Sequence, residues 1–144
     1  RIGTVLYPAL KKLGHRTLVV DFDPHVVERL TANGAEAVFG DLADFDLYAD
    51  LNLARAKIVV STVDDLEDNL QFLSYLKGTR DKPLTLVAAA NQTDSRALSA
   101  AGADFVLVPH EVGGEYLSHL LALHGGDRKI FRALNGQSKR QYIS

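Results

Sequence analysis

Aspartates follow two apolar segments of the sequence, at points where strands are expected to end. A run of valines leads into Asp21, and a second apolar segment leads through Gly40 into Asp41. A carboxylate at the end of a parallel strand can accept hydrogen bonds from both hydroxyls of a ribose, and its charge repels a ribose 2′-phosphate. Asp21 is therefore a candidate ribose ligand; the alternative is a loop residue that caps the next helix. Asp23, before Pro24, is the better cap and leaves Asp21 free.

Polar residues also follow the apolar segment before Asp41 and end a third apolar segment further along the chain. Asp41 can accept a hydrogen bond from an adenine amino group, and Leu42 can pack against the base. Asp41 or Asp44 could equally cap the helix that comes next. Ser61 and Thr62 end the third segment, where hydroxyl and N–H groups can bind a phosphate. A carboxylate pair after them, at positions 64 and 65, is expected to cap the helix that carries an asparagine at position 69.

Gly3 stands eighteen residues before Asp21, at the start of a helical pattern. Dinucleotide-binding domains place G-x-G-x-x-G between their first strand and first helix, with an acidic residue about 20 residues further on. Arg1, Ile2 and Gly3 match only the end of that motif. The first two glycines and the strand before them would therefore lie upstream of residue 1, and the helix start would bind a pyrophosphate through its N–H groups and dipole.

The elements that position these residues alternate between strand and helix. Four of the five predicted strands are almost continuously apolar, as expected for strands covered on both faces. Helical patterns lie between them, and glycines at positions 14, 34, 78 and 102 are suited to left-handed C-caps. Such alternation predicts a doubly wound, mostly parallel α/β sheet flanked by helices. With its first strand missing, the sheet would leave two strands with unpaired edges. The predicted strands are Thr17–Phe22, Ala35–Phe39, Lys57–Thr62, Leu84–Ala90 and Asp104–Val108.

Composition excludes several classes of function. The chain has 144 residues, a net charge of −2 and no cysteine, which argues against nucleic acid as a partner and removes disulfides and thiolate chemistry. Its apolar runs are too short to insert into a membrane, and the five histidines show no metal-binding spacing. Because the chain contains no methionine and begins at Arg1, we expect residues upstream of it in the natural protein.

Taken in order, these motifs resemble the RCK/KTN (TrkA-N-type) nucleotide-binding domain, closest to the cytosolic domain of Kef-type cation:proton antiporters and potassium channels. The resemblance covers residues 1–124 and implies a Rossmann-like domain that binds NAD(H) or an adenine nucleotide (AMP, ADP or ATP). It further implies a cytoplasmic module at the inner face of the membrane, a membrane-embedded transporter or channel domain as partner, and regulation of ion flux. The matching residues are 19–24 (with Asp21, Phe22 and Asp23), Gly34, Gly40, Asp41, 62–65, Asn69, Leu70, 101–104 and Pro109.

The chain departs from this family in three respects. The opening glycines are absent, Ala89 stands where the family often has an arginine, and the companion C-terminal ligand-binding domain is missing. Residues 125–144 are predicted to be a linker with one short helix over 127–134. The preceding helix, 109–123, has more apolar residues than one face can hold, which favours either a homodimer interface or burial against the edge of the sheet.

Three functions are open at this point. The first is the regulatory module, which would catalyse no reaction and would act by shifting a population between two arrangements. The alternative is an NAD-dependent oxidoreductase fragment that lacks its catalytic domain, and a third possibility is a degenerate domain that only supports dimerisation. No acid–base pair is evident in the sequence, which favours the non-enzymatic function.

Overall fold

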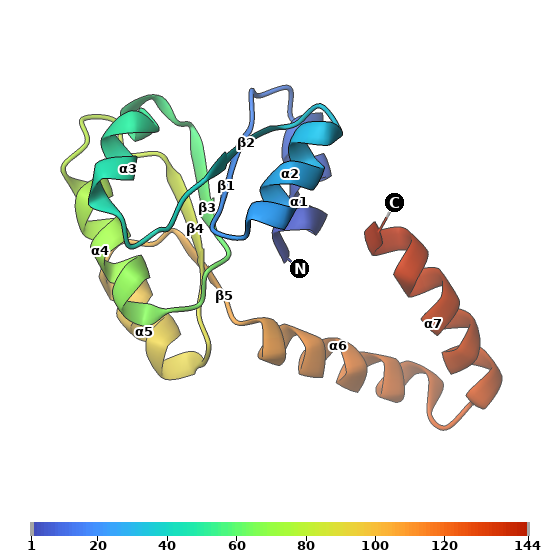
Figure 1. Ribbon diagram of the computed structural model, residues 1–144. Helices are drawn as coiled ribbons and strands as arrows, with labels where there is room; N and C mark the ends of the chain where they lie inside the picture. The colour runs from blue at the N-terminus through green and yellow to red at the C-terminus, as the bar shows by residue number, and fades with distance from the viewer. Residues whose placement is uncertain (1, 144) are drawn as a thin grey trace.

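The computed structural model describes the backbone of residues 2–143 and the side-chain positions 3, 5–53 and 55–135. Strands and helices alternate along it, as the hydrophobic pattern predicts (Figure 1). In chain order the elements are α1 (Ile2–Lys12), β1 (Leu18–Asp21), α2 (Pro24–Ala32), β2 (Glu36–Phe39), α3 (Phe45–Asp50), the short 3₁₀ helix η1 (Leu53–Arg55), β3 (Ile58–Ser61), α4 (Leu66–Lys77), β4 (Leu84–Ala88), α5 (Gln92–Ala100), β5 (Phe105–Leu107), α6 (Pro109–His124) and α7 (Arg128–Ile143).

The strands form two parallel sheets that lie side by side. One sheet pairs β1 with β2, and the other has the order β3-β4-β5. Within the described residues β1 and β3 do not pair with each other, so each ends its sheet with an open edge. The parallel α/β fold is thus confirmed, and β1 and β3 each have one edge that pairs with no strand among the described residues. All strand ends that carry candidate site residues point to the same side of the molecule (Figure 1).

Helices α4 and α5 cover one face of the β3-β4-β5 sheet. Their apolar side chains meet the inward residues of β4 in a cluster built from Leu73, Val87, Ala89, Leu98 and Val108. A second cluster lies between α3 and α4 and contains aromatic rings: the Tyr48 and Phe72 ring centroids are 5.4 Å apart. Together these clusters hold α4 firmly in place, because its apolar stripe belongs to both.

Local sequence signals define most helix ends. Asp23, Asp44 and Asp65 are the N-caps of α2, α3 and α4, and each side chain accepts a hydrogen bond from a backbone N–H of the first turn. Gly14, Gly34 and Gly102 adopt the predicted left-handed conformation. The prediction for Gly78 is wrong: its φ is −77°, because α4 continues in right-handed geometry through its C-cap.

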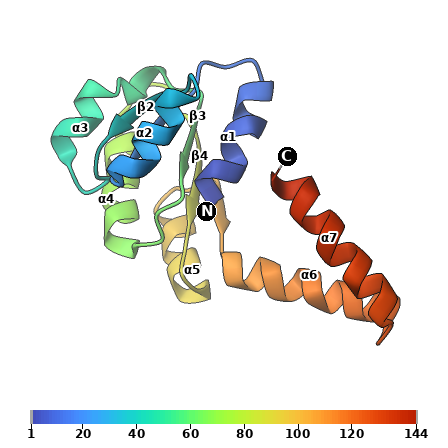
Figure 2. The same ribbon diagram turned by 45° about the vertical axis from the view of Figure 1, so that its right-hand side comes forward.

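Helices α6 and α7 project away from the two sheets, and α7 turns back from the far end of α6 so that the two helices diverge like the arms of a V (Figure 2). No residue of α6 is buried, and Leu117 and Leu123 are 52% and 61% exposed. The alternative in which this helix is buried against the sheet edge is therefore wrong for the single chain. The short helix predicted over 127–134 is also longer, since α7 extends to Ile143. Within the described residues, no helix is long and apolar enough to cross a bilayer.

Candidate nucleotide site

The start of α1 lies against the end of β3. A methyl group placed on Gly3 would be 3.7 Å from Thr62 Oγ1, which is an ordinary van der Waals contact. Gly3 and Thr62 are therefore neighbours, although Gly3 precedes β1 of one sheet and Thr62 follows β3 of the other. The first turn of a helix presents unpaired backbone N–H groups and a partial positive charge, and here these groups adjoin a hydroxyl. This combination suits a phosphate.

Asp21 ends β1 at the same edge. Its Oδ1 accepts a hydrogen bond from the backbone N–H of Asp23 at 2.8 Å, and its carbonyl oxygen accepts one from the N–H of Gly40 at 3.0 Å. The expectation that capping by Asp23 leaves Asp21 free is therefore wrong: one carboxylate oxygen of Asp21 stabilises the turn into α2. This turn fixes the orientation of the carboxylate at the strand end. The bond to Gly40 places the end of β2 directly beside it.

Gly40 has no room for a side chain. A Cβ there would come within 2.6 Å of Leu47 Cδ2 and 3.1 Å of Val20 Cγ1. Asp41 follows it and is exposed, and its Oδ1 accepts a hydrogen bond from the N–H of Ala43 at 3.0 Å. The chain therefore turns tightly at Gly40 and presents the Asp41 carboxylate at the surface.

Leu42 and Phe22 differ in their exposure to solvent. Leu42 is half-buried against the aromatic cluster, and its carbonyl accepts a hydrogen bond from the hydroxyl of Tyr48. Phe22 is 60% exposed just after β1. Of the two, Phe22 is the more accessible to a base, and Leu42 contributes more to packing than the sequence-based interpretation assumed.

Carboxylates gather around Asp41. The pKa of Tyr48 is raised to about 12, first by burial and then by the charges of Asp68, Asp41 and Asp44. The pKa of Asp68 is raised as well, by burial first and then by Asp65 and Asp41. This region therefore has a negative potential, which favours a hydrogen-bond donor such as an amino group and disfavours a phosphate. The N–H groups and hydroxyl at Gly3 and Thr62, which suit a phosphate, lie on one side of Asp21. The carboxylates around Asp41, which suit an amino group, lie on the other.

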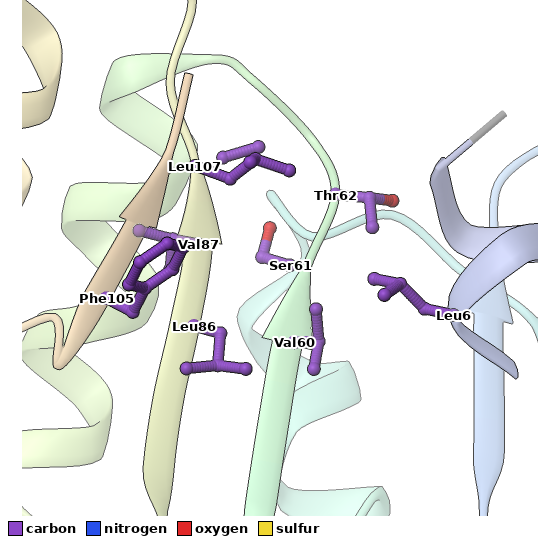
Figure 3. A pocket seen from close by; sticks show the side chains of 9 residues that line it. Leu6, Val60, Ser61, Thr62, Leu86, Val87, Phe105 and Leu107 are labelled. Atoms are coloured by element: carbon purple, nitrogen blue, oxygen red, sulfur yellow. The ribbon is translucent and has the colours of Figure 1, made fainter. Parts of the chain in front are cut away.

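An apolar cavity of about 200 Å³ lies beside Thr62, between α1 and the β3-β4-β5 sheet (Figure 3). Ser61 is 7% exposed, and its Oγ has no hydrogen-bond partner among the described residues. The cavity thus has apolar walls, and Ser61 and Thr62 line it at the end of β3. Its lining residues are Leu6, Val60, Ser61, Thr62, Leu86, Val87, Ala88, Phe105 and Leu107.

The structure brings most of the predicted site residues to one edge, with three differences. Arg1 lies outside the described residues, and Ile2 is described only as part of the α1 backbone. Asp23 acts as the N-cap of α2, and its Oδ1 accepts from the N–H of His25 at 2.9 Å. Ala89 is fully buried in the core, where an arginine would not fit without rearrangement.

Sequence reasoning assigned no structural role to two residues beside the site. Tyr48 supports the loop at Leu42, and Asn69 donates hydrogen bonds to the ends of two strands. A tyrosine on an apolar helix face gives little signal beyond core packing. The asparagine is more informative, because a polar residue inside the apolar stripe of α4 needs buried partners. Among the described residues, no group of three His, Asp or Glu side chains is arranged to hold a metal ion.

Comparison with known proteins agrees with this geometry. The TrkA-N domain family model matches residues 1–109, and the chain belongs to this family. The glutathione-regulated potassium-efflux system protein KefC of Salmonella arizonae is 32% identical over 94 residues, which are 65% of this chain and 15% of KefC. This chain thus corresponds to a small part of the length of that relative.

Solved structures share the fold. The TrkA-N domain of the inner membrane protein YbaL from Escherichia coli superposes with a TM-score of 0.76 at 18% identity, over 84% of this chain and 90% of that one. The GsuK channel bound to NAD superposes with a TM-score of 0.61 at 21% identity, over 75% of this chain and 19% of that one. The Rossmann-like RCK/TrkA-N fold is therefore shown for this chain.

Proposed function

We propose that this chain is a regulatory domain of a potassium or other cation transporter or channel, and that it binds NAD(H) or an adenine nucleotide to control ion flux. One observation carries the proposal: Gly3, Asp21, Asp41 and Thr62 lie along a single edge although they come from four separate segments. Ligands of open parallel α/β sheets bind at this edge, beyond the carboxyl ends of the strands.

The residues present fit such a ligand. Gly3 carries no side chain at the helix start, so a diphosphate can approach its backbone and the hydroxyl of Thr62. Asp21 presents a carboxylate to ribose hydroxyls, and Asp41 can accept from the adenine amino group. The buried Ser61 hydroxyl, which lacks a protein partner, adds a polar group beside the phosphate position. Known relatives support the choice of ligand, because GsuK has been solved with NAD and with ADP.

The proposed mechanism is a population shift. A nucleotide that binds one arrangement of a dimer more tightly moves the equilibrium toward it, and the attached transport domain responds. The membrane-embedded partner is inferred from KefC, whose name describes a potassium-efflux protein. A domain that senses cytoplasmic nucleotides lies at the inner face of the membrane. We further propose that the chain catalyses no reaction, since the Ser61 hydroxyl has no hydrogen-bond partner among the described residues that could activate it.

The homodimer is proposed to form through α6. This helix exposes a broad apolar surface, and a Cβ added at Gly113 or Gly114 would meet nothing within 4 Å among the described residues. No other segment of the described chain therefore packs closely against these two glycines. A second copy would cover this surface and supply close neighbours. The exposed apolar residues of α6 are Val112, Tyr116, Leu117, Leu121 and Leu123.

Thermal denaturation with a nucleotide panel tests the proposal. We expect NAD, NADH, ADP, ATP or AMP to raise the melting temperature of the wild type, because a ligand that binds only the folded state stabilises it. Asp21→Ala should abolish most of this rise, whereas Asp81→Ala, in the loop at the opposite edge, should leave it unchanged. If no nucleotide shifts the melting temperature, the proposal is wrong. Oxidation of NADH with any substrate would favour the oxidoreductase instead.

A further inference from the structure

The buried amide of Asn69 joins the ends of two neighbouring strands. The residue lies on α4 and is 0% exposed. Its Nδ2 donates to the carbonyl oxygen of Val63 at 2.7 Å and to that of Ala88 at 3.2 Å. Val63 belongs to the loop after β3, and Ala88 is the last residue of β4. A single side chain therefore ties both strands at the edge where the nucleotide site lies.

The same side chain fixes the loop that carries Thr62. This loop is held at Val63 by the Asn69 amide and at Asp65 by the start of α4, where Asp65 Oδ1 accepts from the N–H of Asp68 at 3.0 Å. The Asp65 carbonyl also accepts from the Asn69 backbone N–H at 3.2 Å. Thr62 immediately precedes this doubly anchored segment. Its position opposite Gly3 therefore depends on where the loop is anchored.

Helix stability does not explain an asparagine at position 69. Asparagine is a weaker helix former than leucine, and its neighbours in the buried stripe are Phe72, Leu73 and Leu76. An apolar residue there would leave the carbonyls of Val63 and Ala88 without this donor. Buried carbonyls that lose their partners cost free energy, and a loop relieves this cost by moving toward water.

We propose that Asn69 is a positioning residue of the nucleotide site, which holds Thr62 in place opposite Gly3. This inference rests on the proposed function for its ligand. Asn69 does not touch the nucleotide; it acts through the loop. The ends of β3 and β4 are joined by its amide, so the anchor also couples the site to the core under α4 and α5.

Isothermal titration with NAD and ADP tests the proposal on matched variants. Asn69→Ala removes both donors, and Asn69→Asp keeps the volume while its carboxyl, if protonated in the buried site, retains one donor. Thr85→Val is the control, since Thr85 is also 0% exposed and its Oγ1 donates to the Pro83 carbonyl at 2.9 Å, at the opposite end of β4. We expect Kd to rise about tenfold in Asn69→Ala and less in Asn69→Asp, with less than about twofold change in Thr85→Val despite a similar loss of melting temperature.

A double-mutant cycle with Thr62→Val shows whether Asn69 acts through Thr62. If it does, Asn69→Ala should weaken binding much less in the Thr62→Val background than in the wild type. Full additivity of the two effects would overturn the proposal, as would equal losses of affinity in Asn69→Ala and Thr85→Val. Should Asn69→Ala not fold, the same cycle is run with Asn69→Asp.

A measurement without ligand separates this inference from the proposed function. Backbone ¹⁵N order parameters of Thr62 and Val63 should fall from rigid values to below about 0.6 in Asn69→Ala and stay high in Thr85→Val. If the wild type binds no nucleotide but this loop loosens, the proposed function fails and the anchoring role stands. If nucleotides bind and the loop stays rigid in Asn69→Ala, the positioning role is wrong and the proposed function stands.

Discussion

Gly3 at the start of α1 faces the hydroxyl of Thr62, just after β3. A methyl group added to Gly3 would lie 3.7 Å from Thr62 Oγ1. This proximity of Gly3 and Thr62 does not depend on strand pairing between the two sheets, which is absent within the described residues. It brings helix-terminal N–H groups and a hydroxyl to one point, which is the arrangement that a diphosphate requires.

Gly3→Ala should separate stability from binding. The added methyl group fits the fold and lies in a helix, so we expect the free energy of unfolding to rise by at most about 1 kcal/mol. The same methyl group stands where a diphosphate would approach, and nucleotide affinity should fall about tenfold. Calorimetry and titration measure the two effects. Gly126→Ala is the control, because it adds a methyl group between α6 and α7 where nothing lies within 4 Å among the described residues; it should leave affinity unchanged.

Asp21→Asn should change the preference between NAD and NADP. The asparagine oxygen can still accept from the N–H of Asp23, so the turn into α2 is kept. The charge that repels a 2′-phosphate is lost, and the ratio of the two dissociation constants should move toward NADP by about tenfold. Competitive titration measures this ratio. A ratio that stays at the wild-type value, with the Asp81→Asn control also unchanged, would contradict the ribose assignment.

Tyr48→Phe should reduce stability in a pH-dependent way. The variant removes the hydrogen bond to the Leu42 carbonyl, and we expect a loss of about 1–3 kcal/mol at neutral pH. The folded wild type holds the pKa of Tyr48 at about 12, above the ordinary value of about 10.

The raised pKa determines the sign of the pH effect. The unfolded chain loses its proton first, so the contribution of Tyr48 is complete below pH ~10 and is lost as the pH rises toward 12. Urea unfolding should therefore show the difference between the wild type and Tyr48→Phe shrinking over this interval. A constant difference would contradict the assignment.

Leu117→Asp should dissociate the proposed homodimer. Leu117 is 52% exposed in the single chain, so a charge there costs the monomer little but is desolvated in a dimer. Light scattering should give a dimeric mass for the wild type and a monomeric mass for the variant, with unchanged circular dichroism. Ser118→Asp, at the neighbouring exposed position, should remain dimeric. A monomeric wild type, or a dimeric Leu117→Asp, would show that α6 is not the interface.

Much of the fold was predictable from local patterns. Almost continuous apolar runs placed four of the five strands, because a strand covered on both faces leaves no side for polar residues. Asp23, Asp44 and Asp65 were predictable as N-caps, since a short carboxylate before a helix can satisfy its free N–H groups. Gly78 was not, because a helix can end in right-handed geometry without a local signal in the sequence.

The candidate site shows the same division. The sequence by itself determined which residues are candidates for its chemistry: Asp21, Asp41 and Thr62 stand at strand ends that the apolar pattern defines. Only the tertiary structure decided how they are held: Gly40 bonds to Asp21, and Asn69 anchors the loop after Thr62. It also decided that α6 stays uncovered within one chain. Side-chain type and spacing are local properties, whereas hydrogen bonds between segments far apart in the sequence exist only after the sheets and helices have packed.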